Sequence, residues 1–396
     1  MRQEDREMVT NIINGRIIAG DNIIEGGVLV LKDGIIKGIS RCKSPGATVI
    51  DAEGRYVSPG FIDIHTHGAG GADFMDGTVE AYQTATRMHA AHGTTLLFPT
   101  TLTSSNERLF ESFETYRKAQ ACCHDGALMG GLHLEGPYFA PEQAGAQDPA
   151  YLRCPTPEDY EKIMEKGGDI LKRWSFAPEL DGAPAFAAVL KARGIQASIG
   201  HTNATFEECD AAYRSGAKHM THFFSCMSTV MRRNAYRHAG AVEYGYFQDG
   251  MSIEIIADGV HVPKPLLQLV LKIKGVDRIA LVTDSMRAAG MPEGRSILGG
   301  LAEGREVIVE DGVAKMPDRS CFAGSVATTD RLVRTMVQIA GCSITDAVKM
   351  MTLSPARFMG LERTKGSIEP GKDADIVLFD EDIRVSRVII GGKILA

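Results

Sequence analysis

The 396-residue sequence lacks the features that mark membrane, secreted and nucleic-acid-binding proteins. No stretch approaches the roughly 18 uninterrupted apolar residues that a membrane-spanning helix needs. The first residues, MRQEDREMVT, are charged and contain no apolar core, so no signal peptide is expected. A formal net charge of −7 disfavours a nucleic-acid partner or an anionic membrane surface, although local basic groups can still bind a small anion.

Paired cysteines are also missing. The eight cysteines are scattered along the chain, and none of them forms a CxxC pair. In a chain of this length, the pattern predicts reduced thiols in a cytoplasmic protein rather than a disulfide scaffold or a cysteine-bound zinc ion. No internal repeat is visible beyond a strand–helix period.

Both ends of the chain carry the short alternating apolar runs that are typical of β-strands. Near the N-terminus, GGVLVLKDGIIKGIS alternates around a Lys32-Asp33-Gly34 turn, and residues 372–395 contain two or three strands with a Gly391-Gly392 turn. Neither end is long enough to bury a core of its own. We therefore expect residues 1–57 and 361–396 to pair into one small, discontinuous β-sandwich domain.

Residues 58–360 alternate between strands and helices. Strands are predicted at 61–67, 94–100, 127–135, 172–178, 195–201, 217–223, 252–258 and 278–284. Helices are predicted at 78–93, 184–194, 205–216 and 263–275, and each of these segments ends in glycine, as helix C-termini prefer. Eight strands that alternate with helices predict an α/β fold, a (β/α)8 TIM-like barrel that forms the catalytic domain.

Metal-binding residue types follow five of these predicted strands. Barrel enzymes build their sites at the carboxyl ends of the strands, and the residues found there are His65, His67, Glu135, His201, His222 and Asp284. Residues i and i+2 of a strand point to the same side, so His65 and His67 can both face the barrel axis. Imidazole and carboxylate groups together suit zinc, iron or manganese. The set is larger than one tetrahedral ion requires, which predicts one or two divalent ions, with Glu135 able to bridge them.

Each of these residues also has a purely structural interpretation when it is taken alone. An isolated histidine is usually a hydrogen-bonded core or surface residue, Glu135 could lie at a helix N-terminus, and Asp284 could cap a helix. The coincidence of all six at strand ends is what favours a metal site. His133 and His219 lie on the same strands as two of these ligands, and we expect them to pack behind the ligands rather than bind an ion.

The motifs HLEGPYF, GHTNAT, THFFSCM, IADGVHV, LVTDSM and FAGS follow PGFIDIHTHG in this order. Over nearly the whole chain the sequence resembles the N-acetylglucosamine-6-phosphate deacetylases of the amidohydrolase superfamily. The resemblance implies a hydrolase that removes the acetyl group from N-acetylglucosamine 6-phosphate and yields glucosamine 6-phosphate and acetate. Lys172 stands at the entrance of the fourth strand rather than at its exit, which agrees with the deacetylases and disfavours a dihydroorotase or a hydantoinase.

The same resemblance implies roles for the site residues. The main ion would be bound by Glu135, His201 and His222. A second ion would be held by His65 and His67, and Asp284 would be the general base and acid. The substrate contacts that it implies are Gln147, Ser225, Cys226, Arg233, His261 and Phe322.

Phosphate recognition is where the sequence leaves alternatives open. His261 matches a position that contacts the sugar or its phosphate, and its alternative is a capping or surface histidine. An arginine of the run MRRNAYR (Arg232, Arg233 or Arg237) would supply positive charge, reaching across the interface of a homodimer. That run could equally be a solvated loop.

Two departures from the family pattern bear on the sugar. Ser225 stands where the usual motif THLFNAM has asparagine, and Gln147 stands where some members have histidine. A serine hydroxyl cannot make all the hydrogen bonds of an amide, so at least one contact is lost or passes to water. The alternative substrate is therefore another N-acyl amino-sugar phosphate, such as N-acetylgalactosamine 6-phosphate. A catalytically inactive scaffold is the alternative class of protein, but such scaffolds typically lose ligands that this chain keeps.

Overall fold

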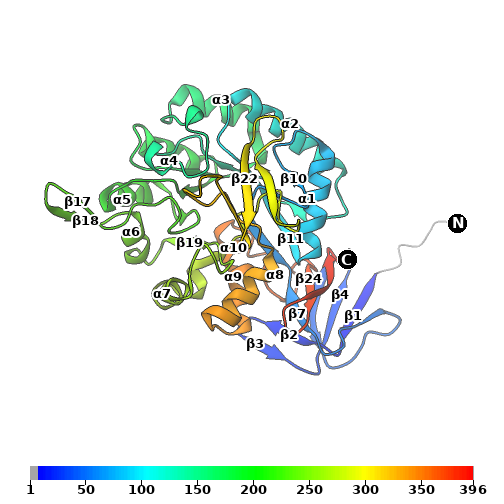
Figure 1. Cartoon of the computed structure of the whole chain (residues 1–396). Coiled ribbons are helices and arrows are strands. Elements are labelled where there is room, and N and C mark those ends of the chain that lie inside the picture. The colour runs from blue at the N-terminus through cyan, green and yellow to red at the C-terminus, as the bar shows by residue number, and fades with distance from the viewer. Residues whose placement is uncertain (1–7, 396) are drawn as a thin grey trace.

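Parallel strands surrounded by helices form the larger part of the computed structural model, which describes residues 8–395 (Figure 1). The charged segment 1–7, for which no signal peptide is expected, lies outside the described residues. In their spatial order the barrel strands are β8 (Phe61–Thr66), β11 (Thr94–Thr101), β13 (Leu132–Glu135), β14 (Leu171–Phe176), β15 (Gln196–Ile199), β16 (His219–Met220), β19 (Ser252–Ile255) and β20 (Ile279–Leu281). The backbone N–H of Asp284 donates to the His65 carbonyl at 2.9 Å and links the last strand to the first. The predicted (β/α)8 barrel is confirmed.

The helices cover the outside of the barrel. They are α1 (Val79–Ala91), α2 (Asn106–Cys122), α3 (Pro157–Gly167), α4 (Ala183–Ala192), α5 (Phe206–Ser215), α6 (Ala241–Phe247), α7 (Lys264–Lys274), α8 (Thr329–Thr335), α9 (Ile344–Met351) and α10 (Leu353–Phe358). Thr205 begins α5 with a capping box, because its side chain accepts from the N–H of Glu208 and the Glu208 carboxylate accepts from the N–H of Thr205. Within residues 8–395, no helix is long and apolar enough to cross a membrane.

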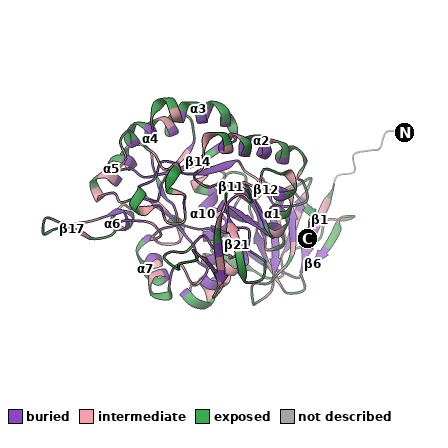
Figure 2. Cartoon of the chain, turned by 45° about the horizontal axis from the view of Figure 1, so that its top comes forward, coloured by how far each residue is buried: buried purple, intermediate pink, exposed green. Residues whose placement is uncertain are grey.

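The main hydrophobic core lies between the barrel strands and these helices. Trp174 and Phe176 of β14 are fully buried and pack against Phe186 of α4, with ring centroids 5.0 and 5.4 Å apart. Figure 2 shows the same division along the chain, with buried strands inside and helices whose outer faces are exposed. This core supports the strands whose carboxyl ends carry the predicted site.

The two ends of the chain pair into a small β-sandwich beside the barrel. One sheet has the order β5 (Ile35–Ser40), β4 (Val28–Lys32), β1 (Val9–Ile13) and β6 (Thr48–Asp51). The other has the order β26 (Lys393–Ile394), β25 (Val385–Ile390), β24 (Ile376–Phe379), β7 (Tyr56–Pro59), β2 (Arg16–Ala19) and β3 (Asn22–Ile24). Leu29 and Leu31 of the first sheet share one buried core with Ile376 and Leu378 of the second, so the predicted sandwich is confirmed.

Several strands differ from those expected. The predicted strand 127–135 is divided into β12 (Leu128–Met129) and β13, and the predicted strand 217–223 is reduced to the two residues of β16. An antiparallel sheet of β21 (Gly294–Leu298), β22 (Arg305–Glu310) and β23 (Val313–Lys315) was not predicted. It is inserted after the last barrel strand and buries Val307 and Val309 in a small core of its own, so the strand–helix period gives no sign of it.

The remaining short elements connect these parts. The strands are β9 (Gly68–Ala69), β10 (Ala72–Asp73), β17 (Met231–Arg233) and β18 (Tyr236–His238). The short helices are η1 (Pro141–Gln143), η2 (Pro149–Tyr151), η3 (Gly168–Ile170), η4 (Val276–Arg278) and the π-helix η5 (Met336–Ala340). The β17–β18 hairpin extends away from the barrel, at the far left of Figure 1.

Candidate metal centre

The six predicted residues meet at the carboxyl ends of the barrel strands. Glu135 is the last residue of β13, and His65 lies within β8. The other four come within three residues after the end of a strand: His67 after β8, His201 after β15, His222 after β16 and Asp284 after β20. His201, His222 and Asp284 have φ angles of 47°, 24° and 46°. Residues other than glycine rarely adopt this left-handed conformation, and strained backbone of this kind clusters at active sites.

These residues form two adjacent groups, each of which could hold a metal ion. One group is His65, His67 and Asp284, and the other is Glu135, His201 and His222, with the ligand atoms of each group within 4.8 Å of one another. Glu135 lies between the groups, because its Oε1 is 3.0 Å from His222 Nε2 and its Oε2 is 3.4 Å from His67 Nε2. A carboxylate placed in this way is suited to bridge two ions.

The hydrogen bonds behind the rings fit a metal site. Nδ1 of His67 donates to the Thr100 carbonyl at 3.2 Å, and Nδ1 of His201 donates to the Gln143 carbonyl at 2.8 Å. In the neutral ring this leaves Nε2 unprotonated and free to act as a ligand. Nε2 of His65 is buried and has no hydrogen-bond partner, an arrangement that a bound cation would explain.

The electrostatics of the site favour bound positive charge. Burial alone would lower the pKa of His65, but the carboxylates of Asp284, Glu135 and Glu254 raise it to about 9. Burial would also lower the pKa of His67, but the hydrogen bonds that its ring donates to the carboxylates of Asp284 and Glu135 raise this pKa to about 10. The carboxylates that favour a protonated imidazole here would favour a bound divalent cation for the same electrostatic reason.

Two charged residues inside the barrel support the ligands, and the sequence analysis did not find them. Glu254 of β19 is fully buried; its Oε2 accepts from His65 Nδ1 at 3.1 Å and from the backbone N–H of His222 at 2.9 Å. Arg173 of β14, also fully buried, forms an ion pair with Glu254 and donates to the Ile64 carbonyl at 3.0 Å. The signal that could have revealed Glu254 is a carboxylate between two isoleucines of a strand. Arg173 has no such signal, because β14 also contains Lys172 and Ser175.

The ligand groups border a cavity of about 550 Å³. Five of the six predicted substrate contacts line it, namely Gln147, Ser225, Cys226, His261 and Phe322. The sixth, Arg233, lies on the β17–β18 hairpin (Figure 1), and its side chain is outside the described part of the structure. Arg232 and Arg237 of the same hairpin do not line the cavity. The structure therefore places the segment MRRNAYR away from the cavity of its own chain.

Two of the lining side chains have well-defined partners. His261 is not a surface or capping residue, because its side chain is 3% exposed and its Nδ1 lies 2.7 Å from Asp258 Oδ2. Gln147 donates from Nε2 to Glu135 Oε2 at 2.7 Å and accepts from the Thr103 N–H at 2.8 Å. Its amide thus holds the Glu135 carboxylate at the wall of the cavity.

The barrel and its paired ligand groups define the class of protein. The model of the Amidohydrolase family matches residues 56–395, and the chain belongs to this family.

Individual relatives are more specific. The chain is 33% identical to an N-acetylglucosamine-6-phosphate deacetylase of Bacillus subtilis over 388 residues, covering 96% of this chain and 95% of the relative. It is 30% identical to an N-acetylgalactosamine-6-phosphate deacetylase of Escherichia coli O157:H7, covering 98% and 99%. The structure of a mutant N-acetyl-D-glucosamine-6-phosphate deacetylase from Mycobacterium smegmatis, in complex with that sugar phosphate, superimposes with a TM-score of 0.88 at 29% identity. That superposition covers 98% of this chain and 99% of the other.

Proposed function

We propose that the chain is a metal-dependent hydrolase that removes the acetyl group from N-acetylglucosamine 6-phosphate, releasing acetate and glucosamine 6-phosphate. The observation that carries the proposal is the position of Glu135 between two ligand groups at one end of a substrate-sized cavity. The similarity to deacetylases of this sugar phosphate extends over more than nine-tenths of the chain. Amidohydrolases are metal-dependent, which agrees with these groups.

The proposed main ion is bound by Glu135, His201 and His222, and the proposed second ion by His65, His67 and Asp284. Zinc, iron and manganese all suit this mixture of imidazole and carboxylate. A bound divalent ion supplies Lewis acidity and a water of lowered pKa. The protein contributes the orientation of the rings, through the hydrogen bonds that fix each Nδ1 of His65, His67 and His201.

Asp284 is the proposed proton carrier of the reaction. Burial opposes its ionisation, but in the metal-free chain the charge of His65 and the hydrogen bond from His67 lower its pKa, and a bound cation would lower it in the same sense. The carboxylate is therefore ionised at neutral pH and able to accept the proton of the attacking water. It then delivers that proton to the departing amine.

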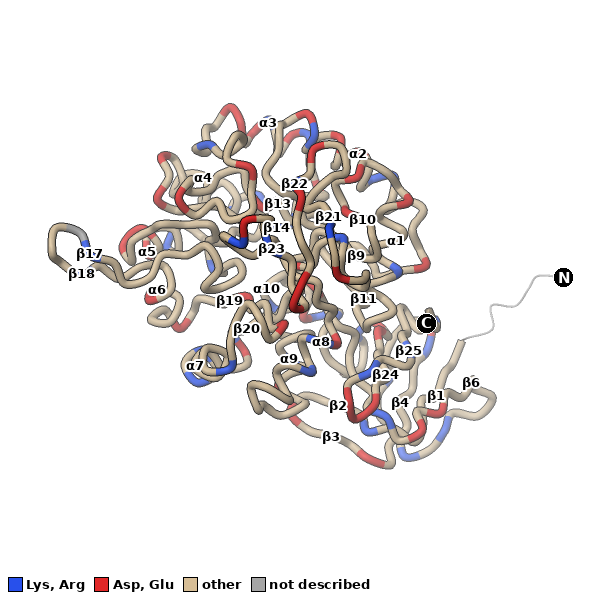
Figure 3. The backbone as a smooth tube through the Cα atoms, viewed as in Figure 1, with Lys and Arg blue, Asp and Glu red and all other residues tan. Residues whose placement is uncertain are grey.

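We further infer a cytoplasmic homodimer. Tyr236 on the β17–β18 hairpin is 76% exposed, and Val230, the residue before β17, is 55% exposed. A protruding hairpin with an exposed aromatic ring and basic residues (Figure 3) is suited to contact a second copy and to bring Arg233 to that copy's cavity.

Acetate release from a matched set of sugars tests the proposal. The set is N-acetylglucosamine and N-acetylgalactosamine, each with and without a 6-phosphate, with zinc, iron or manganese. We expect the highest kcat/KM for N-acetylglucosamine 6-phosphate. Equal rates with the unphosphorylated sugar would contradict phosphate recognition. If no sugar released acetate under metal-replete conditions, the result would favour an inactive scaffold.

The galactosamine epimer is the second candidate substrate. Ser225 lines the cavity at the position of the usual asparagine, and the chain resembles a deacetylase of N-acetylgalactosamine 6-phosphate along almost its full length. A kcat/KM that is higher for the galactosamine epimer than for the glucosamine epimer would favour this assignment.

A further inference from the structure

Two cationic side chains border the candidate active-site cavity from a single hairpin. Lys315 ends β23, and Arg319 lies in the turn that follows it. Among the described residues that line the cavity, these are the only lysine and arginine. The ligand groups at the same cavity include the carboxylates of Glu135 and Asp284, which would repel a dianionic phosphate unless positive charge offset them elsewhere.

The backbone holds this turn in a defined position. Lys315 and Phe322 form a β-bridge, the N–H of Met316 donates to the Cys321 carbonyl at 3.0 Å, and the N–H of Arg319 donates to the Met316 carbonyl at 2.8 Å. The Phe322 ring lies 4.7 Å from the ring of His261. The cations are therefore built into the same wall as the two aromatic residues.

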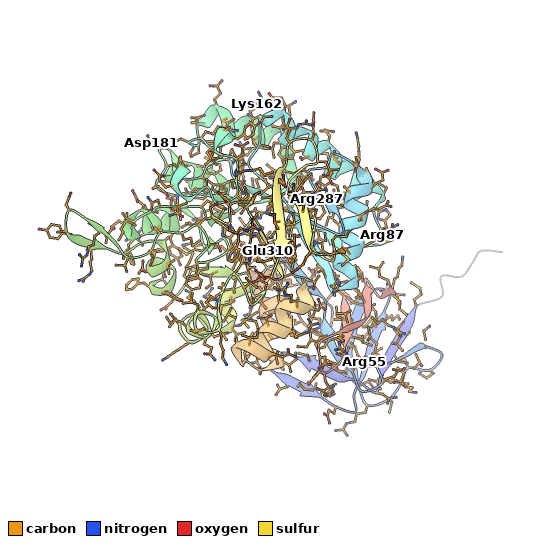
Figure 4. The ribbon with its side chains drawn as sticks, viewed as in Figure 1. Arg55, Arg87, Lys162, Asp181, Arg287 and Glu310 are labelled. Atoms are coloured by element: carbon orange, nitrogen blue, oxygen red, sulfur yellow. The ribbon has the colours of Figure 1, made fainter. Side chains whose placement is uncertain are left out.

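Each cation has a carboxylate partner that another anion can replace. Nε and Nη2 of Arg319 lie 3.1 and 3.2 Å from the two oxygens of Glu310, and Lys315 Nζ lies 2.6 Å from Asp311 Oδ2. The side chains of Arg319 and Glu310 are 51% and 34% exposed, so their pair is hydrated. Figure 4 labels Glu310 near the centre of the view, at the end of β22 in front of the barrel. A phosphate presents the same two-oxygen geometry to a guanidinium group as a carboxylate does, with more charge.

We propose that Arg319, assisted by Lys315, binds the phosphate group of the substrate within its own chain, and that Glu310 occupies the guanidinium group when no substrate is bound. The inference rests on the proposed function and makes it more specific. Arg319 and Lys315 would act in the same cavity as any arginine that the β17–β18 hairpin of a second copy supplies, so the two sources of positive charge do not exclude each other.

Charge-neutralising variants with opposite expected effects test the proposal. The measured quantity is the ratio of kcat/KM for N-acetylglucosamine 6-phosphate to kcat/KM for N-acetylglucosamine. Arg319→Gln should lower this ratio roughly tenfold, mainly through KM, because a bidentate charge-assisted pair is lost. Glu310→Gln should raise the ratio, because it removes the competing anion. Arg295→Gln is the matched control, since Arg295 lies on β21 of the same sheet, pairs with Glu306, and does not line the cavity.

The outcomes separate this inference from the proposed function. A wild-type ratio in Arg319→Gln overturns the inference, and a ratio that falls only in Arg233→Gln assigns the phosphate to the hairpin arginine instead. If Arg319→Gln does not fold, an unchanged ratio in Glu310→Gln overturns it. If the wild-type enzyme shows no preference for phosphorylated sugars, the proposed substrate is wrong. The anion site is then tested separately, by calorimetric titration of wild type and Arg319→Gln with glucose 6-phosphate and with glucose. Equal binding of glucose 6-phosphate by wild type and Arg319→Gln counts against the anion site.

Discussion

The hydrogen bond on one ring nitrogen determines what each buried histidine of the barrel can do. His67 and His201 use Nδ1 to donate to carbonyl oxygens, which leaves Nε2 directed at the ligand cluster. Both ring nitrogens of His133 have protein partners, since Nδ1 lies 3.2 Å from Thr100 Oγ1 and Nε2 lies 2.7 Å from Ser175 Oγ. His133 therefore has no free lone pair for a metal, although its ring contacts that of His65 at 4.6 Å between centroids.

Asp284 is the residue whose replacement separates chemistry from metal binding. Asp284→Asn keeps the size of the side chain but cannot accept the proton of water, so turnover should fall by at least about a hundredfold. The main ion should remain, because its ligands Glu135, His201 and His222 are unchanged, and elemental analysis should still find at least one ion per chain. His222→Ala is the contrasting variant, in which metal content should fall together with activity. Normal turnover in Asp284→Asn would contradict the proposed role.

At the scale of secondary-structure elements, the buried ion pair between Arg173 of β14 and Glu254 of β19 should contribute to the stability of the barrel. Arg173→Met leaves the Glu254 carboxylate buried without its cation, and breaking a buried pair in this way costs about 3–5 kcal/mol of unfolding free energy. The double variant Arg173→Met/Glu254→Met removes both charges and should recover part of that loss. Urea unfolding of the two single variants and the double variant measures the coupling.

An exposed pair provides the control for this cycle. Arg295 and Glu306 pair at 3.0 Å with side chains that are 83% and 54% exposed. Because water screens such pairs, Arg295→Met should change the unfolding free energy by less than about 1 kcal/mol. If Arg173→Met were no more destabilising than Arg295→Met, the buried pair would not hold the two strands together.

The last residue of α7 predicts an unusual dependence of stability on pH. Burial lowers the pKa of Lys274, ordinarily 10.5, to about 8, and its Nζ donates to the Gln248 carbonyl at 2.8 Å. Between these two values the unfolded chain binds more protons than the folded chain, so the stability of the wild type should rise with pH across this window. Lys274→Met should be more stable than the wild type at neutral pH, by about 1 kcal/mol after allowance for partial hydration and the lost hydrogen bond.

Thermal melts across this pH range would check the sign. The advantage of Lys274→Met should shrink as the pH passes from about 8 to about 10. Lys272 lies on the same turn of α7 but is exposed, so Lys272→Met should show no such trend. A wild-type stability that falls across the window relative to Lys274→Met would contradict the assignment.

The same elements show what could be predicted from the sequence. The barrel and the six residues at its strand ends follow from local patterns, because strand periodicity and the residue after each strand are both visible along the chain. Glu254 and Arg173 lie inside strands and acquire a role only when β14 and β19 face the same barrel axis. Lys315 and Arg319 reach the cavity through a sheet inserted after the last barrel strand, whose position depends on tertiary packing rather than on any period.

For the whole molecule, the sequence pointed to an arginine that would serve a different subunit, and the shape of the chain agrees with that possibility. The β17–β18 hairpin extends away from the barrel in Figure 1, and Arg232 and Tyr236 on it are exposed. Such a segment contributes little to the core of its own chain. Its exposed aromatic residue is suited to an interface with a second copy.

Tyr236→Asp tests this arrangement at the level of the assembly. Placing a charge on the exposed ring position should weaken the proposed dimer, so light scattering after gel filtration should show a dimer for the wild type and a monomer for the variant. Leu301→Asp is the control, because Leu301 is also an exposed apolar residue (62%) but lies on the connection between β21 and β22, outside the hairpin. If the partner's hairpin also contacts the phosphate, KM for the sugar phosphate should rise as the variant dissociates and as the wild type is diluted. A wild type that is monomeric at every concentration, with an unchanged KM, would leave the chain's own cations as the source of phosphate recognition.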